Sequence, residues 1–276
     1  MLKTWRLTAK FGWTRSSYVL LSLFLLTVLL LAFVWWPLAE EYLAYIDWSK
    51  PVWGQLDWLL IGLFLVMSLL IMSGADLRRD AWILMVGLAG GLVIEGWGTQ
   101  TEIWTYYTLE RPPLWIIPAW PIASLSIDRL VRFSDKVSPT TLPTRLIRWA
   151  YWIIFPLFFG LMVYFVWPTA GKSLTLMALL LCALLIMTPT DYRLALLTFL
   201  AGAGLGYFLE RWGTTRECWT YYTHQTPPLF AVLAHGMAAV AFWRTVLLLK
   251  KVGRRSVNAI GSHYPPGRSK SATWPM

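Results

Sequence analysis

The chain has little of what soluble enzymes and disulfide-bonded proteins depend on. Only 14% of its 276 residues are charged, and only two are cysteine. Cys182 lies in an apolar run and Cys218 in a polar segment, which excludes a disulfide scaffold and a zinc or iron–sulfur site. Three histidines are too few for the histidine clusters of a membrane di-iron enzyme. Motifs for phosphate binding, dinucleotide binding and a nucleophile elbow are also missing, which excludes the enzyme classes built on them.

Apolar sequence is abundant instead. Apolar residues make up 57% of the chain and the mean hydropathy is +0.55, too high for a water-soluble domain of this length. The chain has eight apolar runs, several of which approach the roughly 20 residues that a helix needs to cross a bilayer, while the shorter ones extend through flanking Trp and Tyr. They cover residues 18–36, 59–72, 81–93, 114–127, 150–167, 174–187, 194–208 and 229–249. The sequence predicts an all-α, polytopic membrane protein with about eight transmembrane helices, and the first of them lacks a cleavage pattern and is retained.

The basic residues indicate topology and not a nucleic-acid partner. When the 24 Lys and Arg are grouped by alternate ends of the eight runs, 19 fall on one side and 5 on the other. The positive-inside rule therefore predicts a protein of the cell membrane with both termini in the cytoplasm. The expected partner of the protein is therefore the lipid bilayer. The basic residues after position 250 have no interleaved aromatic side chains, so we expect residues 251–276 to form a disordered tail near anionic lipid.

An internal repeat is the most specific signal in the chain. A shift of 115 residues places 95–108 on 210–223, with ten of the fourteen positions identical, and also pairs Asp76 with Asp191. Four helices separate equivalent points, so the two halves are expected to be parallel four-helix repeats related by an axis along the membrane normal. The predicted parts are a first repeat over 1–127, a cytoplasmic linker over 128–148, and a second repeat over 149–250, followed by the tail.

Each repeat carries one glutamate just after an apolar run. Gly87, Gly91 and Glu95 share a helix face, and residues 202, 206 and 210 repeat the pattern. Because glycines at this spacing allow close helix packing, we expect the helices over 81–93 and 194–208 to meet, with Glu95 and Glu210 facing one another as a coupled pair. Ionisable groups embedded in a membrane are usually paired, hydrated or functional. The structural alternative is that both glutamates only accept hydrogen bonds from nearby Trp, Tyr or Thr.

Around each glutamate lies a copied set of acidic and aromatic residues. Glu102 and Glu217 follow the two glutamates, and His235 replaces Trp120 in the second copy. Glu95, Glu210, Glu102, Glu217 and His235 are the candidate catalytic residues. The candidate substrate-binding residues are Trp97, Trp104, Tyr106, Tyr107, Trp212, Trp219, Tyr221 and Tyr222. For any single ring an interfacial aromatic belt is the better explanation, and the structural alternative for His235 is a neutral, hydrogen-bonded histidine. Nothing resembles a Ca²⁺ or Mg²⁺ loop, so we predict no metal and no cofactor.

The first copy resembles a membrane family of carotenoid biosynthesis proteins that includes carotenoid hydratases. The resemblance covers about 30 residues in each half. It is carried by Glu95, Gly98, Thr101, Trp104, Tyr106, Tyr107, Pro113, Pro118 and Trp120. The second copy keeps Glu210, Gly213, Trp219, Tyr221 and Tyr222 but has Leu233 and His235 in place of Pro118 and Trp120. The resemblance implies an isoprenoid or carotenoid ligand.

It also implies a reaction: a protonated Glu95 or Glu210 donates to a double bond, and the rings of Trp97, Trp212, Tyr106 and Tyr221 stabilise the cation. Water oriented by Glu102 or Glu217 would complete the hydration. Two other functions stay open: a transporter of lipids or small molecules, and a non-catalytic scaffold that binds partner membrane subunits.

Overall fold

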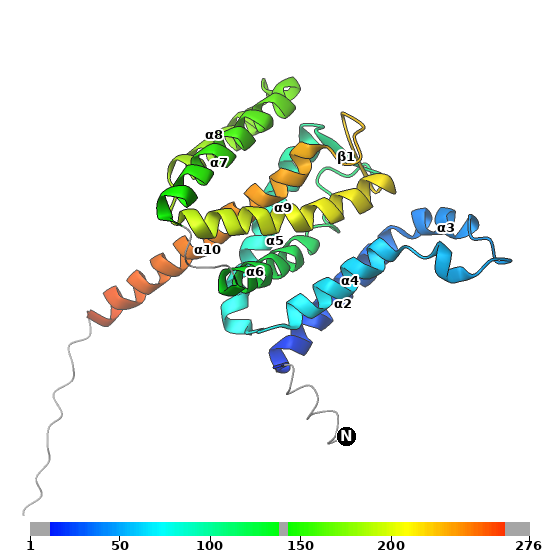
Figure 1. The fold of residues 1–276 in the computed structure, drawn as a ribbon, viewed down its shortest axis with the longest axis horizontal. Helices are drawn as coiled ribbons and strands as arrows, with labels where there is room; N and C mark the ends of the chain where they lie inside the picture. Colours follow the sequence, from blue (N-terminus) through cyan, green and yellow to red (C-terminus); the bar gives the residue numbers. More distant parts are fainter. Residues whose placement is uncertain (1–11, 138–142, 263–276) are drawn as a thin grey trace, which may run out of the picture.

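The computed structural model describes residues 12–137 and 143–262, and nearly all regular structure in these ranges is helical (Figure 1). The longer helices are α2 (Arg15–Val34), α4 (Trp58–Met72), α5 (Leu77–Gln100), α6 (Ala119–Val137), α7 (Thr144–Val166), α8 (Ser173–Met187), α9 (Tyr192–Thr215) and α10 (Leu229–Ser262). The short elements are α3 (Trp36–Ala44), the 3-10 turns η1 (Val52–Gln55) and η2 (Trp167–Thr169), and the strands β1 (Trp104–Tyr106) and β2 (Trp219–Tyr221). The all-α prediction is confirmed.

Five helices of the described ranges are long and apolar enough to cross a membrane: α2, α5, α7, α9 and α10 without its last turns. This confirms that the chain is a membrane protein with transmembrane helices. Two further apolar helices, α4 and α8, have 15 residues each. At about 1.5 Å per residue they are about 22 Å long, shorter than the roughly 30 Å of hydrocarbon in a bilayer.

The helices of the two halves begin and end at equivalent positions. The bounds of α4 and α8, of α5 and α9, and of β1 and β2 all differ by the 115 residues of the sequence repeat. Asp76 and Asp191, which this shift pairs, cap α5 and α9: their side chains accept from the backbone N–H of Arg78 and Leu194. A carboxylate at this position satisfies an N–H group that has no partner inside the helix.

The fourth helix of each half departs from this match. The second half is helical from Leu229, whereas residues 114–118 of the first half form turns and α6 begins at Ala119. Pro118 and Pro121 stand where the second half has Leu233 and Gly236. Proline has no backbone N–H and disfavours helix in the residue before it, so the prolines delay the start of α6.

Four helices form the centre of the bundle and two pairs flank it. In Figure 1, α5, α6, α9 and α10 lie between the pair α2 and α4 on one side and the pair α7 and α8 on the other. We call these pairs the first wing and the second wing. Besides its partner α2, α4 packs against α6 and α9, while α8 packs against α7 and α5. Each wing therefore contributes one helix to the packing of the other half, in addition to the contacts of α6 with α9 and of α10 with α5.

The glycines of the two long helices do not face one another, which corrects the sequence-based expectation. A Cβ on Gly91 would lie 2.5 Å from the ring of Trp120 in α6, and a Cβ on Gly206 would lie 2.5 Å from His235 in α10. Each glycine face thus packs against the next helix of its own repeat. The glycines pack closely against another helix, as predicted, but the predicted partner helix is wrong.

The predicted linker over 128–148 is also wrong in most of its length. Residues 128–137 continue α6 and residues 144–148 begin α7, while 138–142 lie outside the described residues. The reason is a buried ion-pair cluster at the end of the bundle away from the strands. Arg129 donates to both oxygens of Asp80, at 3.2 and 2.5 Å, and Arg132 pairs with Asp128. The polar residues of α6 are therefore packed against α5.

The predicted tail over 251–276 needs a similar correction. Helix α10 continues to Ser262, so residues 251–262 are helical. No proline occurs between Pro228 and Pro265, and without one the polar continuation of the helix has no strong stop signal. Residues 263–276 lie outside the described residues.

Candidate functional site

Glu95 is buried and holds three aromatic hydrogen-bond donors. It is 3% exposed and lies about one turn before the end of α5. Its Oε1 accepts from the Tyr106 hydroxyl at 2.9 Å and from Trp120 Nε1 at 3.0 Å, and its Oε2 accepts from Trp104 Nε1 at 3.0 Å. Hydrogen bonds to a carboxylate are about twice as strong as neutral ones. The glutamate therefore fixes β1 and the start of α6 against α5.

Glu210 has the same arrangement with one change. It is 3% exposed, and it accepts from Trp219 Nε1 at 2.9 Å and from the Tyr221 hydroxyl at 2.8 Å. In place of a third indole, His235 Nδ1 lies 3.6 Å from Glu210 Oε1. The second carboxylate thus has two firm donors and a titratable neighbour.

A glycine one turn beyond each glutamate makes room for the indole that reaches it. A Cβ on Gly98 would lie 1.9 Å from Cη2 of Trp104, and a Cβ on Gly213 would lie 1.9 Å from Cη2 of Trp219. Real carbon contacts are about 3.5–4.0 Å, so only glycine fits. The motif is one structural unit. We call Glu95, Gly98, Trp104 and Tyr106 the first unit, and the residues 115 positions later the second unit.

The two units meet through the strands. β1 and β2 pair antiparallel, with Trp104 opposite Tyr221 and Tyr106 opposite Trp219. In both pairs the ring centroids are 5.9 Å apart. Each of these strand rings donates to one glutamate and contacts a strand ring that donates to the other glutamate. The two units therefore form one aromatic cluster.

A second link between the carboxylates passes through Trp120 and His235. The indole that donates to Glu95 stacks on His235, with centroids 5.7 Å apart and 7° between the planes. His235 Nδ1 is 3.0 Å from the backbone oxygen of Ala231. Because a carbonyl only accepts, Nδ1 carries the hydrogen in this contact. The His235 side chain is 21% exposed against 4% for Glu210, so the histidine is the more accessible of the two.

The tyrosines of both units remain protonated donors. Burial raises the pKa of Tyr106 well above its usual range, and the adjacent Glu95 carboxylate raises it further. Burial and Glu210 raise the pKa of Tyr221 in the same way. Both phenols therefore keep the proton that each donates to its glutamate.

Four of the eight aromatic residues predicted to bind substrate donate hydrogen bonds to groups outside the two units. Trp97 Nε1 donates to Thr175 of α8 at 3.3 Å. Trp212 Nε1 donates to Asp57, the N-cap of α4, at 2.8 Å, and Arg216 donates to the same carboxylate at 2.6 Å. These two tryptophans tie each long helix to the wing of the other half, and their rings also border the aromatic cluster, where Trp97 packs edge-on against Trp104 with centroids 5.9 Å apart.

The other two tyrosines anchor the strands to the wings. The Tyr107 hydroxyl donates to the backbone oxygen of Val34 at the end of α2. The Tyr222 hydroxyl donates to the backbone oxygen of Phe165 near the end of α7, at 2.6 Å. The matching contacts show that α2 and α7 occupy equivalent places although their sequence offset is not 115.

Glu102 and Glu217 do not join the carboxylate cluster. Both residues have left-handed backbone, with φ of 63° and 56°. Glu102 accepts from Arg111 at 2.6 Å, its side chain is 57% exposed, and this arginine lowers the pKa of the Glu102 carboxyl. Glu217 is also exposed. Neither carboxylate therefore takes part in the hydrogen bonds around Glu95 and Glu210.

The sequence analysis missed the tryptophans that close the cluster. Trp35 contacts Trp115, Trp212 and Trp219 at centroid distances of 5.7, 5.0 and 6.4 Å. Trp115 also packs edge-on against Tyr106 at 5.3 Å. Trp35 follows α2, where the 115-residue repeat is not visible, so no pattern connected it to the site.

Metal-binding side chains are not grouped here. In the described part of the chain, no three His, Cys, Asp or Glu residues come together as a metal ion would need. The oxygens of Glu95 and Glu210 accept from indole and phenol groups.

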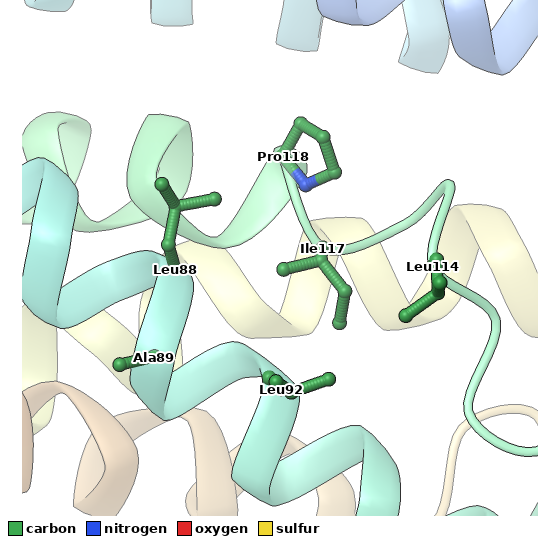
Figure 2. Close-up of a pocket in the computed structure, with 6 residues that line it drawn as sticks. All are labelled: Leu88, Ala89, Leu92, Leu114, Ile117 and Pro118. Carbon is green, nitrogen blue, oxygen red and sulfur yellow. The ribbon is translucent and has the colours of Figure 1, made fainter.

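An apolar groove runs beside the first unit. Leu88, Ala89 and Leu92 of α5 form one wall, and Leu114, Ile117 and Pro118 of the irregular segment before α6 form the other (Figure 2). Its volume is about 410 Å³. The groove exists where the first half departs from the second, since the wall over 114–118 is helix in the equivalent place.

Comparison with protein-family models, with curated proteins and with solved structures finds no match.

Proposed function

We propose that the chain has eight membrane-embedded helices in two parallel four-helix repeats, with the strands at the outer face and both termini in the cytoplasm. The bounds of α4 and α8, and those of α5 and α9, differ by the 115 residues of the repeat, which supports the two repeats. The 19 to 5 distribution of basic residues supports the orientation. Alkaline phosphatase is active only outside the cytoplasm. Fused to the C terminus it is expected to be inactive, and an active fusion would contradict this topology.

We further propose that the protein binds an isoprenoid or carotenoid lipid in the bilayer and hydrates one of its double bonds at Glu210 and His235. The observation that carries the proposal is the contact of a buried carboxyl group with a more accessible histidine, 3.6 Å apart, inside a cluster of aromatic rings. A buried acid that can exchange protons through a partly buried, more accessible neighbour suits general-acid catalysis.

The proposed reaction needs no redox partner. The Glu210 carboxyl group gives its proton to one carbon of a trisubstituted double bond, and the other carbon becomes a tertiary cation. The π faces of Trp219 and Tyr221 stabilise that charge. Water adds to the cation and loses a proton, and His235 returns a proton to Glu210. The sum is an alkene and one water giving an alcohol.

The hydrogen bonding favours the second unit over the first for this role. Glu95 accepts from three donors, and Trp120 occupies the place of the histidine. Glu210 accepts from two donors and lies beside His235, which stacks on Trp120. In this proposal Glu95 holds the strands in position and Glu210 reacts.

The test compares the lipids of a host that makes the wild type with those of hosts that make the glutamine variants. Glu95→Gln and Glu210→Gln each place an amide among N–H and O–H donors, so both are expected to lower stability by a similar amount. Only Glu210→Gln, and His235→Trp, which copies the first unit, should remove the hydrated product at matched protein levels. If the double variant Glu95→Gln/Glu210→Gln leaves the carotenoid and polyisoprenoid profile unchanged, the hydration proposal fails.

A scaffold function has one observation in its favour. Each of the four carboxylate oxygens accepts a hydrogen bond that ties a strand to a helix. A purely structural latch would show the same contacts. In that case the glutamine variants would lower the unfolding temperature and the yield of partner subunits in gentle detergent, while the lipid profile would follow protein level alone.

A further inference from the structure

The groove beside the first unit lies in the membrane-facing part of α5. Leu88 and Leu92 are 44% and 45% exposed, and both belong to the helix Leu77–Gln100, which is long and apolar enough to cross a membrane. The neighbouring Met85 and Val93 are also exposed. The groove is therefore continuous with an apolar helix face that contacts lipid in the bilayer.

The walls of the groove exclude a polar or charged occupant. All six lining residues are apolar: Leu88, Ala89, Leu92, Leu114, Ile117 and Pro118. An unpaired polar group placed against them would lose its hydration without gaining a hydrogen bond. The volume of about 410 Å³ is within the range of small-molecule sites, about 300–1,000 Å³.

The shape favours a flexible chain over a protein helix. One wall is the regular surface of α5, and the other is the irregular turn segment that ends at Pro118 (Figure 2). A helix with its side chains is rigid and about 10–12 Å wide, so it would not follow the irregular wall. A hydrocarbon chain is flexible and can follow it. A chain that leaves bulk lipid for the groove gains from close contact with the two walls, since both environments are apolar.

We propose that this groove is a seat for one acyl chain of a bilayer phospholipid. The seat belongs to the first half only, because the prolines that create its irregular wall are absent from the second half. A chain bound there lies near Glu95, since Leu88 precedes Glu95 by seven residues on the same face of α5, or about 10 Å along the helix. The proposal does not depend on the proposed hydration.

The experiment uses the full chain in nanodiscs of phosphatidylcholine that carries a diazirine on one acyl chain. After illumination, mass spectrometry measures the label on residues 114–118 and on the equivalent residues 229–233. The internal repeat supplies the control, because both segments lie at the same depth. The groove predicts about tenfold more label on 114–118, which corresponds to about 1.4 kcal/mol of preference. Equal labelling of the two segments in the wild type would overturn the proposal.

A matched pair of variants sharpens the test. Ala89→Phe fills the groove from the α5 wall and is expected to reduce the label on 114–118 to the level of 229–233. Gly204→Phe makes the equivalent change in α9, where a Cβ meets nothing within 4 Å, and should leave the label on 114–118 unchanged. Unchanged labelling in Ala89→Phe would refute the seat, and an Ala89→Phe protein that fails to fold leaves the wild-type ratio as the deciding result.

Discussion

Gly98→Ala tests whether the first unit is one packed structure. The added methyl group would lie 1.9 Å from Cη2 of Trp104, about 1.6 Å inside normal contact, so the indole must move. Its hydrogen bond to Glu95, 3.0 Å long, is then lost. A hydrogen bond to a charged group contributes about 1.5–3 kcal/mol, and forcing extra volume into a packed core costs about 1–3 kcal/mol. Alanine regains up to about 1 kcal/mol of helix propensity, so the expected net loss is about 3 kcal/mol.

Gly96→Ala is the control, because it adds the same methyl group two residues away. The nearest atom to its Cβ is Nε2 of Gln100 at 4.0 Å, so this variant should be neutral or slightly more stable than wild type. Thermal unfolding of detergent-purified protein, followed by size-exclusion chromatography, measures the difference. The double variant Gly98→Ala/Trp104→Phe should be no less stable than Trp104→Phe, since the clash is gone. Equal unfolding temperatures for Gly98→Ala and Gly96→Ala would refute the packing described above.

Three further predictions concern groups outside the two units. Asp80→Asn leaves the buried Arg129 with Asp128 as its acidic partner and should lower stability by about 3 kcal/mol in thermal unfolding. An unfolding temperature equal to that of the wild type would contradict the cluster's role. Burial raises the pKa of Cys218 to about 12, so in a Cys182→Ser protein iodoacetamide at pH 8 should react only after unfolding, and rapid labelling of the folded protein would contradict the structure. Arg111 lowers the pKa of Glu102, so the small stability that this carboxylate adds is present at neutral pH and is lost as the pH falls through its lowered pKa. The unfolding temperatures of the wild type and of Glu102→Gln should therefore converge in acid. Unfolding temperatures that diverge in acid would count against the ion pair.

Local pattern was sufficient to predict the helices and the two units. Apolar runs of about 20 residues identify membrane helices because the bilayer leaves few alternatives for an exposed backbone. The copied segment 95–108 marked the residues that gather around each glutamate, since the same spacing of Glu, Gly, Trp and Tyr occurs twice. What the spacing could not show was that Gly98 and Gly213 serve an indole nine residues beyond the glutamate and not another helix.

Long-range partners were beyond the reach of the pattern. The roles of Trp97 and Trp212 depend on the crossing of each wing to the opposite half, and no repeat in the sequence encodes that crossing. The polar start of the supposed linker was misread for a related reason. Asp128 and Arg129 look solvated until Asp80, 49 residues before Arg129, is placed against them. A charged residue in a sequence predicts exposure to solvent, and the burial of Arg129 is explained only by its ion pair with Asp80.

Neither half of this molecule is complete alone, because α4 packs on α9 and α8 packs on α5. A single ancestral copy would have needed a twin chain to fill the same contacts, and in such a dimer every substitution is made twice. In a single chain that restriction does not apply. The equivalent positions 120 and 235 can therefore carry an indole in one half and an imidazole in the other, so that the two sides of a nearly symmetric interface differ.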